Sequence, residues 1–511
     1  MENAVEMRQI TKRFGEVTAN HKVDLTLGRG EILSLLGENG SGKTTLMNML
    51  SGIYFPDSGQ ILVNGREVTI RSPRDALALK IGMIHQHFKL VDVFTAGENI
   101  VLGLRDTGRF DRKEISRQIR ELSAKYGFDV DPDRKICDMA VSEKQTVEII
   151  KALYRGADVL ILDEPTAVLT PQETEKLFAV LRNMKKDGKS IVIITHKLTE
   201  VMAISDRVAV LRKGEYIGTV ETKDTNPQML TEMMVGRSVK LNIDRPQPEH
   251  PRKRLEVSHL SCRDGEGVRV LDDVSFTAMA GEILGVAGIA GSGQRELCEA
   301  IAGLYPVEKG RIVYWDCQDP EKAENLVGKS PMAIRNLGVS LAFVPEDRLG
   351  MGLVGSMGMV DNMMLKSYDK GRWFFTDPKA PRALAEEIKD RLEVSTPGLT
   401  TPVRRLSGGN VQKVLVGREI ASGPSVLMAA YPVRGLDIHS SYTIYRLLNE
   451  QKAKGVAVLY VGEDLDVLLE LCDRILVLCG GQVSGVVDGR TATKEQVGLL
   501  MTQIKEGKQH G

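Results

Sequence analysis

The sequence predicts an α/β fold that occurs twice in the chain, and three observations predict it. A glycine-rich loop at residues 37–45 stands between a short apolar stretch and a helical one. Two other runs, 159–162 and 190–194, are continuously apolar, which is typical of strands in a parallel sheet that is covered on both faces. A related glycine-rich loop recurs at residues 288–293, and repetition over this distance indicates a duplicated domain.

Length and composition restrict the possible functions. The 511 residues suffice for at least two domains, and the 68 basic and 68 acidic side chains cancel, which argues against a nucleic-acid partner. No apolar run approaches the roughly 20 residues of a membrane span, and the first residues lack the features of a signal peptide, so we expect a soluble, cytosolic chain. The six cysteines show no metal-ligand spacing and are expected to be reduced.

The loop at residues 37–45 fits the phosphate-binding pattern of Gly, four residues, Gly, Lys, then Ser or Thr. Its backbone N–H groups can face a phosphate, Lys43 supplies a positive charge, and the Thr44 hydroxyl can hold Mg²⁺. Residues 30–36 before it read as a strand and 45–50 after it as a helix, which is the expected order. The predicted phosphate-binding residues are Gly37, Glu38, Asn39, Gly40, Ser41, Gly42, Lys43, Thr44 and Thr45.

Further along the first half, two helices and a pair of carboxylates are expected. Residues 114–126 and 174–185 have helical spacing, and Gly188 is a plausible stop for the second helix. Asp163 and Glu164 follow the apolar run 159–162, at the strand end where α/β folds present ligand-binding groups. Downstream of a phosphate-binding loop, Asp163 fits a Mg²⁺ partner and Glu164 a general base for the attacking water.

The repeat divides the chain. Gly37 corresponds to Gly288, and the sequence Gly-Glu-Ile-Leu before the loop recurs at 281–284. Prolines and charges between the halves favour an extended linker. We therefore expect a first domain at 1–240, a linker at 241–253, a second domain at 254–500 and a C-terminal tail at 501–511.

With these motifs the chain resembles the nucleotide-binding subunit of ATP-binding cassette transporters, from about residue 5 to about residue 500. The resemblance implies two tandem nucleotide-binding domains, each a mainly parallel sheet with a helical subdomain, and ATP and Mg²⁺ as cofactors. It also implies Phe14 as the aromatic under adenine, Gln86 as the loop glutamine that senses Mg²⁺ and permease, and His196 as the sensor of the γ-phosphate. Lys43, Glu164 and His196 are then the catalytic residues, and Thr44, Gln86 and Asp163 bind the metal.

The family also has a Leu-Ser-Gly-Gly-Gln motif whose N–H groups cap the γ-phosphate at a helix N-terminus. In the first half the corresponding residues are Met139-Ala140-Val141-Ser142-Glu143, without glycines and with a carboxylate where phosphate would approach. We expect poor phosphate capping there. In the second half the motif is nearly complete, as Leu406-Ser407-Gly408-Gly409-Asn410.

The second half lacks the other residues that are expected to bind phosphate and Mg²⁺ and to activate water. Lys43 corresponds to Gln294 and Thr44 to Arg295. Asp163-Glu164-Pro165 becomes Ala430-Tyr431-Pro432, while His196, Gln86 and Phe14 become Glu463, Glu346 and Gly265. In the family, each ATP lies between the loop of one domain and the Ser-Gly-Gly motif of the other. The resemblance thus implies one competent composite site, from 37–45 with 406–410, and one degenerate site, from 288–295 with 139–143.

Three functions are compatible with this pattern. The leading one is the ATPase of an importer, a peripheral protein on the cytoplasmic face of the membrane with two permease subunits and, indirectly, an extracytoplasmic substrate-binding lipoprotein. Residues 84–100 and 152–157 look more like nucleoside importers than simple-sugar importers, which stay the alternative. A soluble twin-cassette ATPase without a permease is disfavoured by the short linker and the zero net charge.

Overall fold

The computed structural model divides into two compact units, Met1–Lys240 and Leu241–Gly511, each with its own hydrophobic cores. The described residues are 2–15, 17–85, 88–104, 111–167, 169–236, 243–248, 251–289, 291–316, 319, 321–336, 341–345, 347–368 and 377–503.

A six-stranded sheet forms the centre of the first unit, in the order β10-β9-β3-β8-β7-β6. Its strands are parallel except β10, which pairs antiparallel with β9. The side chains of β3, β7 and β8 are all buried, because both faces of the sheet are covered. The strand bounds are β3 Ile32–Leu36, β6 Ile81–Ile84, β7 Val159–Asp163, β8 Ser190–Ile194, β9 Arg207–Arg212 and β10 Glu215–Glu221.

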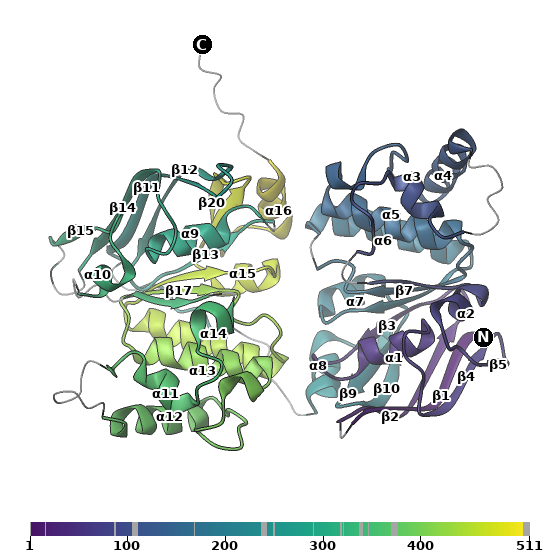
Figure 1. The fold of residues 1–511 in the computed structure, drawn as a ribbon, viewed down its shortest axis with the longest axis horizontal. Coiled ribbons are helices and arrows are strands. Elements are labelled where there is room, and N and C mark those ends of the chain that lie inside the picture. Colours follow the sequence, from purple (N-terminus) through teal and green to yellow (C-terminus); the bar gives the residue numbers. More distant parts are fainter. Residues whose placement is uncertain are drawn as a thin grey trace, which may run out of the picture. The chain divides into compact units, whose positions relative to one another are not determined.

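Helices α5 and α6 cover one face of this sheet, and α1 with a second, antiparallel sheet of order β2-β1-β4-β5 covers the other (Figure 1). Helices α3, α4 and α5 share a separate apolar core, the expected helical subdomain. The bounds are β1 Asn3–Phe14, β2 Val17–Gly28, β4 Ser58–Val63, β5 Arg66–Val68, α1 Lys43–Leu50, α2 Pro73–Ala78, α3 Ala96–Val101, α4 Arg112–Tyr126, α5 Val141–Tyr154, α6 Pro171–Lys186, α7 Leu198–Ile204 and α8 Pro227–Val235, with short 3₁₀ turns at Ile136–Asp138 and Thr222–Asp224.

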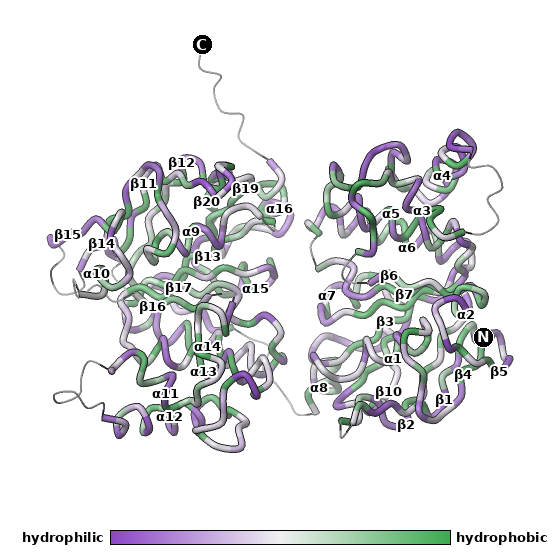
Figure 2. Tube along the Cα trace, viewed as in Figure 1, coloured by the Kyte–Doolittle hydropathy of each residue, from purple (hydrophilic) through white to green (hydrophobic). Residues whose placement is uncertain are grey.

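The predicted α/β class is confirmed. The strand expected at 30–36 is β3, the helix expected at 45–50 begins two residues earlier as α1, and the helices expected at 114–126 and 174–185 are α4 and α6. Figure 2 shows apolar residues concentrated along the central strands, while α4 carries polar residues on its outer side. The antiparallel sheet is absent from the sequence-based prediction, since its long strands β1 and β2 mix polar and apolar residues.

The second unit repeats this plan. Its central sheet has the order β16-β17-β18-β13-β19-β20, with α13 and α14 on one face and α9 with the sheet β12-β11-β14-β15 on the other (Figure 1). The bounds are β11 Lys253–Arg263, β12 Arg269–Met279, β13 Ile283–Ala287, β14 Lys309–Trp315, β15 Ala323–Asn325, β16 Leu341–Val344, β17 Val426–Ala430, β18 Ala457–Val461, β19 Arg474–Cys479, β20 Gln482–Asp488, α9 Gln294–Ile301, α10 Pro331–Asn336, α11 Met359–Met364, α12 Lys379–Arg391, α13 Gly408–Ala421, α14 Ile438–Ala453, α15 Leu465–Leu471 and α16 Lys494–Thr502, with a π-turn at Arg348–Gly352 and a 3₁₀ turn at Val403–Arg405.

The segment between the halves is anchored to the second unit. The Arg245 guanidinium donates to the carbonyl oxygens of Leu469, at 2.9 Å, and Cys472, at 2.5 Å, at the C-terminal end of α15. A cation at this position satisfies carbonyl groups that have no partner within the helix. Strand β11 begins at Lys253, inside the range expected for the linker.

No helix among the described residues is long and apolar enough to cross a membrane. The five cysteines in the described part of the chain are free thiols, and all except Cys137 are buried. Cys317 lies outside the described residues.

The same ion pair occurs in both units at different depths. In the second unit Lys452 lies 2.7 Å from Asp473, with side chains only 1% and 9% exposed, while the corresponding Lys185–Asp206 pair is 36% and 37% exposed. Both aspartates also accept the backbone N–H at the start of a central strand, Ile283 or Ile32. The pair therefore ties strand ends together in each unit, and only one copy is shielded from water.

We expect Lys452→Met to destabilise the second unit by about 2–4 kcal/mol, because it removes the buried cation of Asp473 and leaves only the more distant Arg490, at 3.6 Å. Lys185→Met is the matched control, and it should cost about 1 kcal/mol or less in the first unit because that pair is solvated. Hydrogen exchange of β18 and β19, compared with β8 and β9, measures both. Equal losses of protection in the two variants would contradict the prediction that the buried pair contributes more to stability than the solvated pair.

Candidate functional site

The loop after β3 turns sharply into α1, and Gly42 is the residue that permits the turn. Gly42 is the N-cap of α1 with φ of 95°, in the left-handed region, and a Cβ there would lie 2.3 Å from the carbonyl oxygen of Ala19. Side chains rarely adopt this conformation. The loop therefore needs glycine at this position to bring its N–H groups around the helix N-terminus.

The Lys43 side chain folds back over its own loop. Its ammonium donates to the carbonyl oxygens of Gly37, at 2.7 Å, and Glu38, at 2.9 Å, and the residue is only 6% exposed. Burial lowers the pKa of Lys43, while the nearby Glu164 and Asp163 carboxylates act in the opposite direction. The positive charge is thus held inside the loop and faces acidic groups.

Two buried polar atoms beside the loop have no hydrogen-bond partner among the described residues: Ser41 Oγ and Asn20 Oδ1. The Asn20 amide nitrogen donates to the Gly42 carbonyl oxygen at 3.2 Å, so a side chain of β2 holds the end of the loop through a hydrogen bond. A buried hydroxyl without a partner is costly unless a ligand satisfies it. The loop therefore fits a phosphate group, which would accept from Ser41, from Lys43 and from the N-terminus of α1.

Asp163 is the last residue of β7 and is 8% exposed. Burial and the charge of Glu164 raise the pKa of Asp163 to about 6, and a hydrogen bond from the Thr44 side chain acts against this rise. Asp163 and Thr44 thus meet at the mouth of the loop. Mg²⁺ is commonly held by one or two protein oxygens together with phosphate and water, so this pair fits a magnesium ion.

Glu164 and His196 are in direct contact. His196 Nδ1 lies 3.0 Å from Glu164 Oε1, and this hydrogen bond is the largest of the causes that lower the pKa of Glu164. Glu164 has φ of 48°, a left-handed conformation that is unusual for a residue with a side chain. Its N–H donates to the carbonyl oxygen of Ile194, the last residue of β8, at 2.9 Å. The backbone turn and His196 together fix the direction of this ionised carboxylate.

Further residues, which the sequence-based prediction missed, support the backbone turn at Glu164. Gln145, on α5, donates to the carbonyl oxygen of Pro165 at 2.6 Å, and Thr166 Oγ1 donates to the Glu200 carboxylate at 2.6 Å. Lys197 also donates to the Thr166 carbonyl oxygen at 3.2 Å. Partners of this kind act through distant backbone groups, so no short motif reveals them.

Phe14 lies at the end of β1 and is 44% exposed, and its ring centroid lies 5.2 Å from that of Tyr54, with the two ring planes at 71°. An exposed aromatic face is compatible with stacking on a base. Gln86 and its counterpart Glu346, both singled out in the sequence, lie outside the described residues.

The second unit keeps the shape of the site without its charges. Gln294 takes the place of Lys43, and its amide donates to the Ile289 carbonyl oxygen at 3.2 Å. Gly293 also has φ of 95°, like Gly42. Tyr431 has φ of 50° and donates its N–H to Val461 at 2.8 Å, as Glu164 does to Ile194. The fold itself therefore imposes the left-handed turn, whichever side chain it carries.

The helices that begin at the two motif segments, 139–143 and 406–410, differ at their N-termini. In α13 the cap is Ser407, whose Oγ accepts from the Asn410 amide at 2.9 Å, and no carboxylate stands in the first turn. In α5 the Glu143 carboxylate folds back to accept the Ala140 N–H at 2.7 Å and also binds Arg134. An acidic side chain of the same chain thus lies at the N-terminus of α5 and accepts the N–H of its N-cap residue, and poor phosphate capping there stays a prediction.

The model of the ABC transporter family matches this chain twice, at residues 20–167 and 271–432. Each match covers one loop together with the strand end that carries Asp163-Glu164 or Ala430-Tyr431.

Three curated proteins illustrate the full-length similarity. The nucleoside import ATP-binding protein NupA of Lactococcus lactis is 43% identical over 98% of both chains, and the guanosine import ATP-binding protein NupO of Bacillus subtilis is 41% identical over 100% of both. The ribose import ATP-binding protein RbsA 1 of Rubrobacter xylanophilus is 41% identical over 99% of both. Among solved structures, the archaeal ribosome recycling factor aABCE1, in complex with ribosomal stalk protein aP1, shares the fold at 17% identity, with a TM-score of 0.61 over 94% of this chain and 90% of that one.

We expect Lys43→Gln to keep the loop folded but to lose nucleotide binding. Gln294 shows that glutamine can make the same kind of inward contact, so the substitution removes the charge and leaves the geometry. Binding of a fluorescent ATP analogue should weaken by at least about tenfold, or ~1.4 kcal/mol, while the melting temperature stays near the parental value. Parental affinity in Lys43→Gln would show that the ammonium is not needed.

Proposed function

Because this chain belongs to the ABC transporter family, we propose that it is the ATP-hydrolysing subunit of an importer and that its catalysis resides in the first unit. The observation that carries this proposal is the convergence of the Lys43 loop with Asp163, Glu164 and His196, which β3, β7 and β8 bring to one edge of the sheet. The full-length relatives named above are import ATP-binding proteins.

The proposed mechanism assigns one task to each group. The loop N–H groups and Lys43 bind the phosphates, and Thr44 with Asp163 holds Mg²⁺, which when bound neutralises developing negative charge. Glu164 is ionised and orients the attacking water as general base. His196 bonds to Glu164 through Nδ1, so its other ring nitrogen is available to the γ-phosphate.

We further propose that the first loop works with the Ser407–Asn410 segment, and that the other combination of motifs hydrolyses no ATP. The support is chemical: α13 has an N-terminus without a carboxylate in its first turn, whereas Glu143 occupies that of α5. Gln294, Ala430 and Tyr431 supply no cation, metal ligand or base. One competent site per chain is therefore the arrangement that the residues favour.

The partners and location follow from the importer role. We propose two permease subunits and an extracytoplasmic substrate-binding lipoprotein, with this chain on the cytoplasmic face of the membrane. Phe14, with its exposed ring, would stack on adenine. Gln86 would sense Mg²⁺ and permease.

For the cargo we propose nucleosides. Two full-length relatives carry nucleoside or guanosine import in their names, which agrees with the residues at 84–100 and 152–157. Simple sugars are the second candidate, because ribose and glucose import proteins are 40–41% identical over nearly the whole chain. The likeness to aABCE1 concerns the fold alone, so it adds no support for a soluble ATPase without a permease.

In the complex with its permease, Glu164→Gln should abolish ATP turnover while ATP binding persists, because the water loses its base but the loop is intact. Gln294→Ala, at the second-unit counterpart of Lys43, should leave turnover nearly parental. Ser407→Arg should abolish turnover, because it blocks the N-terminus of α13. Phosphate release measured on the three purified complexes tests the proposal, and turnover that is lost in Gln294→Ala but kept in Ser407→Arg would refute it.

Uptake of labelled guanosine into cells that express the complete transporter should be saturable and should disappear with Glu164→Gln. Excess unlabelled nucleoside should compete, and excess ribose should not. Absence of guanosine uptake together with saturable uptake of labelled ribose would assign the transporter to simple sugars.

A further inference from the structure

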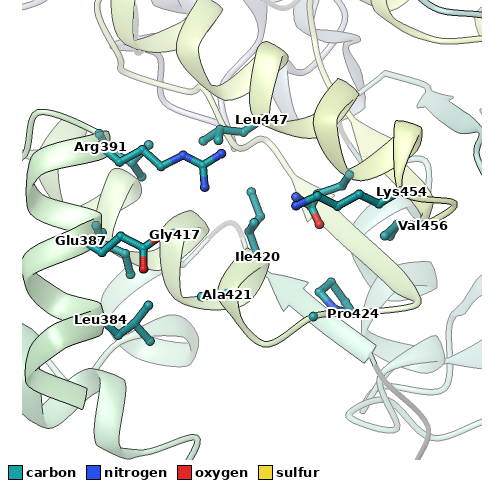
Figure 3. Close-up of a pocket in the computed structure, with 14 residues that line it drawn as sticks. Leu384, Glu387, Arg391, Gly417, Ile420, Ala421, Pro424, Leu447, Lys454 and Val456 are labelled. Atoms are coloured by element: carbon teal, nitrogen blue, oxygen red, sulfur yellow. The ribbon is translucent and has the colours of Figure 1, made fainter. Parts of the chain in front are cut away.

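The helical layer of the second unit contains a pocket of 540 Å³ between α12, α13 and the C-terminal end of α14. Figure 3 shows it: Glu387 and Arg391 come from α12, Ile420 from α13 and Lys454 from just after α14. The charged ends of Arg391 and Lys454 point into the same space. None of these residues belongs to the nucleotide site proposed above.

The corresponding residues of the first unit can be identified, and they show what fills the equivalent space there. Helices α5 and α13, and likewise α6 and α14, correspond with an offset of 267 residues, since Val141 matches Gly408 and Pro171 matches Ile438. Helices α4 and α12 align with an offset of 266, because each is followed by a residue in the left-handed conformation, Gly127 or Glu393. Every residue of the pocket therefore has a known counterpart in the first unit.

In the first unit a carboxylate occupies this place. Asp187 accepts from the Tyr126 hydroxyl at 2.6 Å and from the Lys125 ammonium at 2.7 Å. Tyr126 itself is 2% exposed, so its ring fills the gap between the helices. In the first unit, the Asp187 carboxylate therefore serves as the partner of both the Lys125 ammonium and the Tyr126 hydroxyl.

In the second unit the cation stays but has another partner: Arg391 pairs with Glu450, whose counterpart in the first unit is Asn183, and the position of Asp187 holds no carboxylate. Arg391 corresponds to Lys125, Leu392 to Tyr126 and Lys454 to Asp187, so a ring is lost and a carboxylate is replaced by an ammonium. Among the described residues, no carboxylate lies within ion-pair distance of Lys454, whereas Arg391 pairs with Glu450.

Two further substitutions shape the space. Tyr154, whose hydroxyl donates to Gln118 at 2.7 Å, corresponds to Ala421, which removes a ring and opens space. Ile150 corresponds to Gly417, and there α12 moves in to take up the volume of the lost side chain. A Cβ at Gly417 would lie 2.9 Å from Ile388, so the close approach of α12 requires glycine there. The pocket is therefore built into the packing of the helices.

One change places a polar group in the apolar wall. Met184, fully buried in the first unit, corresponds to Gln451, which is 3% exposed and lines the pocket. The Gln451 amide nitrogen is buried and has no hydrogen-bond partner among the described residues. A buried donor without a partner is unfavourable, by an amount that a bound acceptor would recover.

We propose that this pocket binds a small organic carboxylate with an apolar body. The carboxylate would take the place that Asp187 holds in the first unit, where Lys454 supplies the positive charge, Arg391, already paired with Glu450, lies beside it, and Gln451 donates a hydrogen bond. The body would lie against Leu384, Ile388, Leu447 and Val456, which also line the pocket. Glu387 and Glu450, the acidic groups beside Arg391, disfavour a multiply charged anion such as a nucleotide phosphate.

The site is separate from the proposed catalysis. Ile420 stands 12 residues after Gly408 on α13, which at 1.5 Å per residue places the pocket roughly 18 Å along the helix from the Ser407 cap. Binding of the carboxylate therefore needs neither ATP nor a working Glu164, and it can be tested on the purified chain alone.

The test is titration of the full chain with phenylacetate, followed by calorimetry and by the shift in melting temperature. Phenylacetate should bind saturably and raise the melting temperature, and neutral phenylacetamide should bind at least about tenfold more weakly. Lys454→Asp restores the residue of the first unit and should abolish binding, because its carboxylate occupies the site. Gln451→Met should weaken binding, because the amide donor is lost.

Lys186→Asp is the matched control, since it changes the net charge equally on the surface of the first unit, and it should bind phenylacetate like the parental chain. The proposal is overturned if phenylacetate fails to bind. It is also overturned if the amide binds as well as the acid, or if Lys454→Asp and Lys186→Asp bind phenylacetate with equal affinity.

Discussion

The contact on which the first unit's chemistry depends is the inward turn of one ammonium group. Lys43 is almost fully buried and binds the carbonyl oxygens of its own loop, while Asp163 and Glu164 stand across from it. A buried charge is tolerated only when hydrogen bonds and opposite charges offset its lost hydration. The strand order that brings β3 beside β8, and β8 beside β7, is what places those opposite charges there.

The second unit separates the geometric role of this loop from its electrostatic role. Gln294 makes a similar inward contact, and Gly293 has the same left-handed backbone as Gly42. Tyr431 likewise keeps the strained turn of Glu164 without its carboxylate. The backbone shape is therefore a property of the fold, whereas the charges of Lys43, Asp163 and Glu164 are additions that one copy carries and the other lacks.

The sequence predicted the elements whose signals are local. The strands β3, β7 and β8 are uninterrupted apolar runs, and the loop glycines stand at positions that only glycine fills easily. It did not predict the contacts that depend on tertiary packing. Gln145 reaches Pro165 from another helix, and Arg245 binds carbonyl groups more than two hundred residues away, so neither has a neighbour in sequence that would reveal it.

The contacts of residues 139–143 likewise depend on side chains that the motif alone does not reveal. The sequence showed only that Glu143 stands where phosphate would approach. In the structure Glu143 caps its own helix by accepting the Ala140 N–H, and it is held there by Arg134. A carboxylate at a helix N-terminus is favourable for the helix and unfavourable for a second anion at the same place. Glu143 therefore stabilises its own helix from a place where it would oppose a second anion, while α13, capped by Ser407, keeps its first turn free of carboxylates.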